Sequence, residues 1–417
     1  MDIHNLDLGY ISNCQICNSS NLSQILNLGF TPPCDSLLSI EELKKSENYY
    51  PLNLIKCEEC DLLQIDYVVD PNILFHKNYP YRSGITSSLA NNLMTGARKF
   101  VDKFNIQSNS LIIDIGSNDG TFLKGFKEKN MRVLGVEPTN IAKIANDDGI
   151  ETVQEFFSKE VSINLKNKYG SAKIVTAANM FAHVQNLGDL IKGTENILDN
   201  DGYFITESHY SLSILDTLQF DSIYHEHLKY YSLKDLIKLF SYYNFTVIDA
   251  EKIPNYGGSI RCYAQKGKDR QQSENLINLL SEEENKKIYS NNTWIDFSKK
   301  VEIQKSKFKY FISNAINNKK SICGIGSPGR SCTLLNYYGI SPNEMPYIAE
   351  QSTCLKLGLY SAGQHIPIVD EKRMFEEQPD YAVMLSWHYS DKIIENLRKK
   401  GLKSKIVIPL PEIIIID

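Results

Sequence analysis

Short apolar runs alternate with longer segments of mixed polarity over most of this 417-residue chain. Each run has the length and the Ile, Val and Leu content of a buried strand, and most intervening segments are long enough for a helix. This alternation predicts a parallel, doubly wound α/β sheet covered by helices on both faces. The runs of this first unit are 111–115, 132–136, 151–153, 174–177, 203–206, 245–250 and 259–265, of which the last ones predict an antiparallel edge.

The pattern changes after residue 266. Residues 267–318 are polar and charged with helical spacing, which predicts a helical connector. Apolar runs at 320–326, 345–348, 381–385 and 405–408 then predict a second, smaller α/β domain. We therefore expect four parts: an N-terminal module at 1–70, the first α/β domain at 71–266, the connector at 267–318 and a C-terminal α/β domain at 319–417.

The first strand, at 111–115, runs into the turn Asp114-Ile115-Gly116-Ser117-Asn118-Asp119-Gly120. Such a turn lets backbone N–H groups at a helix N-terminus approach a ligand closely. Glu137 follows the next strand and can accept hydrogen bonds from both hydroxyls of a ribose. The spacing is not GxGxxG, and a P-loop lysine is absent, so we do not expect tight binding of nucleotide phosphates at this turn.

Together these features resemble the S-adenosylmethionine (SAM) site of class I methyltransferases; an ordinary βαβ turn with an unrelated acid is the alternative. The resemblance implies that the turn receives the methionine end of SAM and that Glu137 holds its ribose. Glu155 or Phe156 would lie against the adenine. The full set of expected SAM-binding residues is Asp114, Gly116, Ser117, Asn118, Glu137, Glu155, Phe156 and Asn179.

Two CxxC pairs lie in the N-terminal segment, Cys14–Cys17 and Cys57–Cys60. Four thiolates close a tetrahedral Zn²⁺ site without an open position, so the metal would be structural. A redox CxxC or two disulfides are the alternatives, and both suit a reducing cytosol poorly. We therefore expect residues 1–70 to form a zinc-binding module.

Composition narrows the class of protein further. An apolar content of 42% and a charged content of 23% are typical of a globular protein. A net charge of −5 gives no general attraction to nucleic acid or anionic membranes. Because we find neither a membrane-span pattern nor a signal peptide at the N-terminus, we expect a cytoplasmic monomer without nucleic-acid or membrane partners.

The densest ionisable cluster is Asp221-Ser222-Ile223-Tyr224-His225-Glu226-His227. It follows the 203–206 strand, near the sheet edge where open α/β folds bind ligands. A neutral imidazole can act as general base, while Glu226 could orient it and Tyr224 could donate to an oxyanion. The His-x-His pair could instead bind a metal or be structural. His183 follows the 174–177 strand and points toward the same rim.

Other candidates are weaker on their own. The turn Gly324-Ile325-Gly326-Ser327-Pro328-Gly329-Arg330 could hold an anion or be purely structural. Arg261 follows Gly257-Gly258-Ser259-Ile260 and could recognise a phosphate or carboxylate, or lie on the surface. Tyr79 and Tyr81 lie at the entry to the first α/β domain, where a tyrosine usually serves packing alone.

In their order along the chain, these motifs resemble the sugar C-methyltransferases that act on nucleotide-linked 4-keto-6-deoxy sugars. The resemblance includes the CxxC pairs, the 114–120 turn, Tyr224-His225-Glu226-His227 and Gly257–Arg261, and it continues through Thr333–Tyr337 and His365–Ile368. It implies that His227 removes a proton next to the ketone, supported by Glu226. Tyr224 and His183 would stabilise the enolate oxygen, and Tyr79 or Tyr81 would complete the pocket.

The resemblance also implies substrate-binding roles and marks departures from the family pattern. The expected substrate-binding residues are Tyr81, His225, Ser259, Arg261 and Arg330. Arg330 stands where the family usually has lysine, Glu350 where it has aspartate, and Trp387-His388 where it has Trp-Asn. We expect methylation at C3, the commoner position among these relatives. An O- or N-methyltransferase and a non-catalytic, zinc-anchored nucleotide-sugar-binding protein are the other two hypotheses.

Overall fold

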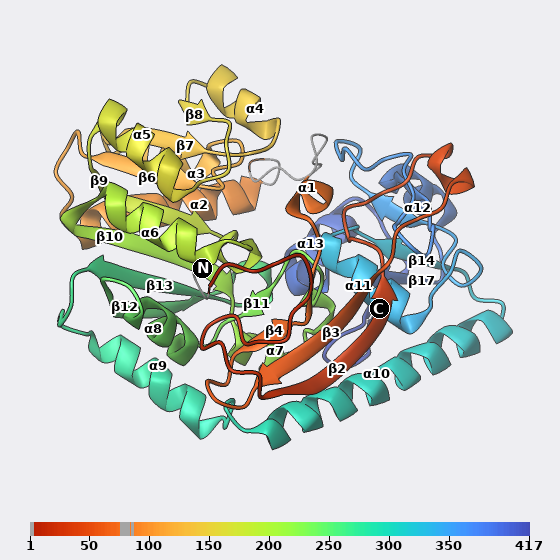
Figure 1. The fold of residues 1–417 in the computed structure, drawn as a ribbon. Helices are drawn as coiled ribbons and strands as arrows, with labels where there is room; N and C mark the ends of the chain where they lie inside the picture. The colour runs from red at the N-terminus through yellow and green to blue at the C-terminus, as the bar shows by residue number, and fades with distance from the viewer. Residues whose placement is uncertain (1–3, 76–83, 85–86) are drawn as a thin grey trace.

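The structure is a computed structural model that describes residues 4–75, 84 and 87–417. Two α/β lobes lie side by side, with the N-terminal strands between them; in this view α9 (Glu274–Asn285) runs beneath the first lobe and the long α10 (Asn291–Asn317) beneath the N-terminal strands and the C-terminal lobe (Figure 1). The described strands form sheets of seven, six, four and two strands. The prediction of a class I methyltransferase-like sheet with an N-terminal module and a second α/β domain is confirmed.

The first lobe contains the seven-stranded sheet, in the order β12-β13-β10-β9-β6-β7-β8. Strands β10 through β8 are parallel, while β13 and β12 add the predicted antiparallel edge. The bounds are β6 Leu111–Ile115, β7 Arg132–Val136, β8 Thr152–Val153, β9 Ala172–Ala178, β10 Leu198–His209, β12 Phe245–Ile253 and β13 Ser259–Lys266. Because β7 and β9 flank β6 on opposite sides, the strand order reverses at β6, where open α/β sheets bind ligands.

Helices α5 and α8 of this lobe begin at residues that cap them. Ser158 caps α5 and Ser232 forms a capping box with Asp235 at α8, which satisfies backbone N–H groups at each helix start. The bounds are α2 Ser87–Lys103, α3 Thr121–Lys127, α4 Ile141–Asp147, α5 Lys159–Tyr169, α6 Leu187–Ile197, α7 Ser211–Asp216 and α8 Leu233–Ser241.

The C-terminal lobe contains a six-stranded sheet, in the order β16-β15-β14-β17-β18-β19. Only β19 is antiparallel to its neighbour. The bounds are β14 Ile322–Ile325, β15 Ile348–Glu350, β16 Ile368–Asp370, β17 Tyr381–Met384, β18 Lys405–Ile408 and β19 Ile414–Ile416, with helices α11 Gly329–Tyr338, α12 Glu371–Glu377 and α13 Ser390–Lys399.

One predicted strand of this lobe was misplaced, and two short strands were missed. The expected strand at 345–348 begins only at Ile348, because Met345 N–H donates to Ser341 O in a turn closed by Glu344. β16 and β19 have three residues each, too few for the alternation of polar and apolar positions to stand out.

The predicted connector consists of two helices, α9 Glu274–Asn285 and α10 Asn291–Asn317. Trp294 Nε1–H donates to Ile288 O at 2.6 Å and fixes the break between them. Along α10, Trp294, Phe297, Val301 and Phe308 are buried in one core together with residues of the C-terminal lobe and of the N-terminal strands. The connector therefore ties the parts of the molecule together and is not a spacer.

Among the N-terminal strands, β2 and β3 are long and the others are short, and their sheet includes a strand from further along the chain. The strands are β1 Gly9–Tyr10, β2 Leu22–Thr31, β3 Tyr50–Cys57, β4 Leu63–Ile65 and β5 Tyr67–Val68, followed by α1 Pro71–Leu74. Strand β11, Lys229–Tyr230, pairs with β4 and completes the four-stranded sheet. The domain limits at 70, 266 and 318 stay predictions.

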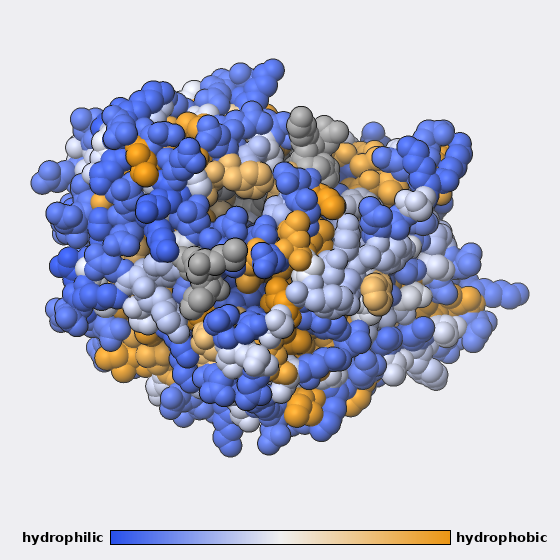
Figure 2. All heavy atoms as spheres, viewed as in Figure 1, coloured by the Kyte–Doolittle hydropathy of each residue, from blue (hydrophilic) through white to orange (hydrophobic). Residues whose placement is uncertain are grey.

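The surface is largely hydrophilic on the face shown in Figure 2, with hydrophobic residues in separate groups. Among the described residues, none of the helices combines the length and apolar character needed to cross a bilayer.

Candidate functional site

A cavity of about 1180 Å³ lies between the two lobes. Its first wall is the carboxyl edge of the seven-stranded sheet, with residues that follow β6, β7, β9 and β10. Its second wall comes from the C-terminal lobe, with Ser327–Arg330 and Glu350 among the lining residues. The volume exceeds that of a typical site for one drug-sized ligand, so the cavity can hold two substrates.

On the first wall, the turn after β6 is held to the end of β7 by hydrogen bonds. Gly116 N–H donates to Val136 O at 2.8 Å, and Asn118 N–H donates to Glu137 Oε2 at 3.0 Å. Gly116 has φ +70°, and a Cβ there would lie 2.9 Å from Met180 Cγ. Glycine is therefore required for this close backbone approach.

Several buried polar groups beside this turn have no hydrogen-bond partner in the described part of the chain. They include Ser117 Oγ, Asn179 Oδ1 and Ser208 Oγ, all on residues that line the cavity. Unpaired buried polar atoms are costly, so their presence fits a polar ligand that completes their bonds. Asp114 is buried and accepts from Thr176 Oγ1 at 2.6 Å, and burial raises its pKa to about 8.

Of the two candidates for contact with the adenine, Phe156 lines the cavity and is 51% exposed. Glu155 is exposed and lies outside the lining. The geometry therefore favours the aromatic side chain over the carboxylate.

Further into the cavity, three histidines and a tyrosine surround one another. The His227 ring centroid lies 4.7 Å from that of His183, 4.5 Å from that of His209 and 4.0 Å from that of Tyr224. All four residues line the cavity. His227 Nδ1 lies 2.8 Å from Ser222 O. Because a carbonyl only accepts, Nδ1 carries the proton and Nε2 keeps a lone pair.

Burial keeps these imidazoles neutral. It lowers the pKa of His183 to about 4 and that of His209 to about 3, and the pKa of His227 falls well below its usual value because of burial and the two neighbouring imidazoles. Burial also raises the pKa of Tyr224 well above its usual range, so its hydroxyl stays protonated and can donate. The cluster therefore combines a neutral base with a neutral donor.

Glu226 is 4% exposed, lines the cavity and accepts a hydrogen bond from the Cys34 thiol at 3.3 Å. Asp35 lies beside this pair, and the three donor atoms fall within 4.8 Å of one another. Lys356 Nζ contacts Asp35 Oδ1 at 2.9 Å, so a cation already balances this carboxylate. We therefore describe this group as a hydrogen-bonded network that supports Glu226.

The structure does not bring three of the predicted substrate-binding side chains to the cavity. His225 Nε2 lies 3.2 Å from Pro51 O in the core, and Ser259 Oγ donates to Asn255 O at 3.0 Å. Arg261 forms a buried ion pair with Glu207 and a partly exposed one with Glu251, each at 2.6 Å. These contacts hold the three side chains inside the protein, and His225 Nδ1 has no hydrogen-bond partner in the described part of the chain.

Tyr79 and Tyr81, the remaining predicted tyrosines of the site, lie outside the described residues. The structure therefore gives no geometry for either hydroxyl.

Arg330 reaches the cavity but is held by the first lobe. Its Nη2 contacts Asp221 Oδ1 at 3.0 Å and Gln219 Oε1 at 2.8 Å, and Trp387 Nε1–H donates to Asp221 Oδ2 at 2.8 Å. Burial raises the pKa of Asp221, while the Arg330 charge opposes that shift. The arginine that we expected to bind substrate is therefore also a link between the lobes.

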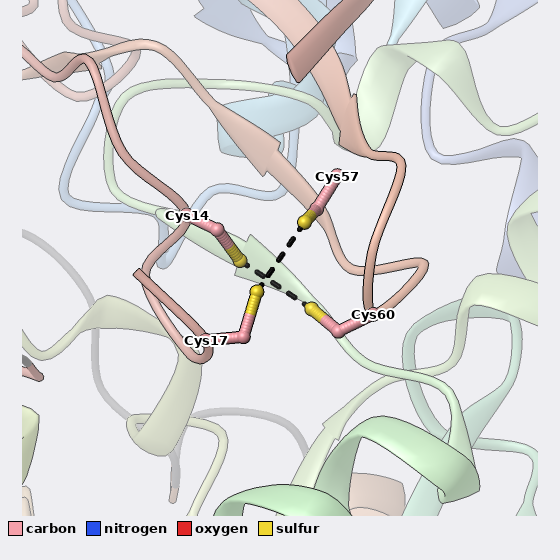
Figure 3. Close-up of side chains that lie close together, drawn as sticks. All are labelled: Cys14, Cys17, Cys57 and Cys60. Carbon is pink, nitrogen blue, oxygen red and sulfur yellow. Dashed lines mark hydrogen bonds between the residues drawn. The ribbon is translucent and has the colours of Figure 1, made fainter. Parts of the chain in front are cut away.

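The four N-terminal cysteines converge as predicted, with their sulfurs pointing toward one another (Figure 3). Cys14 Sγ lies 3.4 Å from Cys60 Sγ, and Cys17 Sγ lies 3.5 Å from Cys57 Sγ. Tetrahedral Zn–S bonds of about 2.3 Å place sulfurs about 3.8 Å apart, so the cluster fits a Zn²⁺ ion after a small expansion.

Three family models match successive parts of the chain. Residues 14–75 match a zinc binding domain, residues 90–250 a methyltransferase domain and residues 254–411 a C-methyltransferase C-terminal domain. C-methyltransferase NovU of Streptomyces niveus is 29% identical over 406 residues, which cover 96% of each chain. Together these matches identify the chain as a C-methyltransferase.

Solved structures also resemble part of this C-methyltransferase. A SAM-dependent methyltransferase from Clostridium acetobutylicum has 13% identity and a TM-score of 0.35, covering 43% of this chain and 92% of its own. Magnesium protoporphyrin IX methyltransferase from Synechocystis has 12% identity and a TM-score of 0.33, covering 42% and 83%. The domain matches and the four-cysteine cluster identify SAM and zinc as the cofactors of this C-methyltransferase.

Sequence reasoning missed several residues of the C-methyltransferase cavity. His209 ends β10, so the rule that ligands meet the carboxyl ends of parallel strands could have found it. His388 and Tyr256 also line the cavity, but from a 3-10 turn and a strained loop that carry no periodic signal. Lys229 is buried behind His183, donates to Val184 O at 3.0 Å, and burial lowers its pKa to about 7.

Proposed function

We propose that this C-methyltransferase methylates the carbon next to the ketone of a nucleotide-linked 4-keto-6-deoxy sugar, with His227 as the base. The observation that supports it most directly is the hydrogen bond from His227 Nδ1–H to Ser222 O, which leaves Nε2 free to take a proton. Carbon beside a ketone is a poor nucleophile until that proton is removed.

Proton transfer places a positive charge on His227 and a negative charge on the substrate oxygen at the same moment. In a cavity shielded from water, the attraction between these two charges opposes the desolvation that lowers the pKa of His227. The Tyr224 hydroxyl can donate to the developing oxyanion, as can His183 if its ring presents an N–H. Glu226, fixed by Cys34, supports the cluster.

SAM, when bound, supplies the electrophilic methyl group. Glu137 would hold its ribose, the Gly116–Asn118 turn its methionine end, and Phe156 would lie against its adenine. Ser117 Oγ and Asn179 Oδ1 would complete their hydrogen bonds on this cofactor. Holding both reactants in one cavity contributes much of the rate, because an aligned pair reacts without further loss of rotational freedom.

We propose that the C-terminal part, from about residue 319, closes on the nucleotide, as the zinc module at 1–70 and the connector at 267–318 hold the two lobes together. Methylation at C3 is the regiochemistry we propose, on the resemblance to the sugar C-methyltransferases. The NovU relationship supports a sugar substrate without specifying its nucleotide.

The test is incubation with SAM and a panel of dTDP-, GDP-, CDP- and UDP-linked 4-keto-6-deoxy sugars, with the product carbon identified by NMR. We expect a new methyl group at C3. In D₂O without SAM, deuterium should enter the position next to the ketone, which separates C-methylation from O- or N-methylation. Methylation at C5 would contradict the regiochemistry, and no turnover of any 4-keto sugar would contradict the substrate class.

A further inference from the structure

The glycine turn of the C-terminal lobe repeats the geometry of the turn that we assign to SAM. Gly326 N–H donates to Ala349 O at 2.9 Å and Ser327 N–H donates to Glu350 Oε1 at 2.5 Å. The similar contacts in the first lobe run from Gly116 N–H to Val136 O and, one residue further along the turn than in the second lobe, from Asn118 N–H to Glu137 Oε2. In each case a carboxylate at the end of the neighbouring parallel strand holds the turn.

The repetition extends to the other carboxylate oxygen and to the glycine. Glu350 Oε2 accepts from Gln351 N–H at 3.2 Å, as Glu137 Oε1 accepts from Thr139 N–H at 2.9 Å. Gly326 has φ +77°, and a Cβ there would clash with Ser386 Oγ. A carboxylate has about four lone-pair positions, so Glu350 keeps acceptor capacity beyond these two bonds.

Both turns face the same cavity. The turn of the C-terminal lobe has features of a ligand site in addition to the helix N-terminus that follows it. Ser327, Gly329, Arg330 and Glu350 line it. Arg330 is 5% exposed, and its Nε has no hydrogen-bond partner within the described ranges. An unpaired guanidinium N–H beside backbone N–H groups suits a phosphate, and a carboxylate beyond them suits a ribose.

We infer that Glu350 binds the 2′ and 3′ hydroxyls of the nucleotide of the sugar substrate, so that this enzyme prefers ribonucleotide-linked sugars over 2′-deoxyribonucleotide-linked ones. The inference rests on the proposed function for its substrate class and adds the identity of the pentose. A 2′-deoxyribose offers one hydroxyl to a carboxylate placed for two. One buried hydrogen bond to a charged group is then missing, which corresponds to about a tenfold to hundredfold loss of affinity.

The test measures binding alone, by calorimetry on the full-length, zinc-loaded protein with S-adenosylhomocysteine present. The probes are the matched pairs GDP and dGDP, CDP and dCDP, and UDP and dUDP, together with dTDP. We expect the ribonucleotide of the recognised base to bind about 10–100 times more tightly than its 2′-deoxy counterpart. Equal affinities within a factor of two would overturn the inference.

Glu350→Gln keeps the size of the side chain and replaces one acceptor by a donor. We expect the ribose-to-deoxyribose ratio to fall to about threefold or less in this variant, whereas the control Glu376→Gln, at an exposed carboxylate of the same lobe, should keep the wild-type ratio. A ratio that persists in Glu350→Gln would assign the preference to another residue and overturn the inference.

The outcome is separate from that of the methylation test. If a 4-keto sugar is methylated but ribose and deoxyribose forms bind equally, the role of Glu350 fails and the proposed function stands. If none of the nucleoside diphosphates binds, the pentose inference fails whatever the reaction proves to be. If binding discriminates but no sugar is methylated, the nucleotide site stands and the proposed reaction fails.

Discussion

Replacing His227 by glutamine removes the base that we propose and preserves its anchor. The glutamine amide can still donate to Ser222 O, the bond that now holds Nδ1 at 2.8 Å. The lost feature is the lone pair on Nε2, since a neutral amide nitrogen does not accept a proton near neutral pH. Because the surrounding rings of His183, His209 and Tyr224 stay in place, the change isolates proton removal from the shape of the cavity.

The expected loss in turnover follows from the role of a general base. Such a group contributes about 10²–10⁴-fold, which corresponds to about 3–5 kcal/mol in the activation free energy. SAM affinity should stay within about twofold, because the residues proposed to hold SAM lie on the Gly116–Asn118 turn and at Glu137. The turnover rate should therefore fall while the dissociation constant of SAM stays nearly unchanged.

The assay is methyl transfer from labelled SAM, together with deuterium exchange into the substrate in D₂O. His225→Gln is the matched control: it removes the neighbouring imidazole, whose Nε2 lies beside Pro51 O and outside the cavity. We expect His225→Gln to keep turnover per folded molecule and His227→Gln to lose both turnover and exchange. Near-wild-type exchange in His227→Gln would refute the assignment of the base.

Three further outcomes are expected. Glu137→Ala should weaken the binding of SAM by about 1–3 kcal/mol, because the ribose hydroxyls lose their acceptor. Calorimetry measures this change, and an unchanged dissociation constant would place the ribose elsewhere. Cys57→Ser should give protease-sensitive protein with less than one zinc per chain, while Cys354→Ser keeps its zinc; a metal-free Cys57→Ser that stays folded and active would refute a structural role. Burial lowers the pKa of His225 to about 4, so the folded state stays unprotonated there while the unfolded state gains a proton below about pH 6.5. Between pH 7.5 and 5, the free energy of unfolding of the wild type should therefore fall by about 2 kcal/mol more than that of His225→Gln. Urea unfolding measures both values, and equal losses in the two proteins would contradict the lowered pKa of His225.

The parts of the fold that were predictable from sequence are those whose signal is local. The buried strands of the first sheet are continuous apolar runs, and the spacing of the two CxxC pairs predicts a site of four sulfurs. The missed features depend on partners far away in the chain. Residues 229–230 form a strand because β4 is there to pair with them, and two residues carry no period of their own.

The candidate site divides along the same line. The sequence could place His183 and His227 at the cavity. His183 follows a buried strand, and His227 ends a dense cluster of ionisable residues. Arg261 and His225 were assigned to substrate because their type and neighbours suit binding, yet in the structure Arg261 pairs with Glu207 and His225 Nε2 lies beside Pro51 O. A sequence does not reveal whether a buried polar side chain faces a ligand or another part of the same protein, since both arrangements use the same residue types.

The pairing of β4 with β11 has a consequence for how the chain folds during synthesis. Gln64 of β4 lies opposite Lys229, so the N-terminal sheet is complete only after more than half of the chain has left the ribosome. Until then β4 exposes an open edge, which is a site for aggregation. A fragment that ends near residue 70 lacks β11 and therefore keeps the open edge of β4. A fragment that begins near residue 70 lacks β4, so β11, which starts two residues after His227, has no partner strand. The zinc-bearing segment and the segment that carries His227 are therefore expected to fold together or fail together.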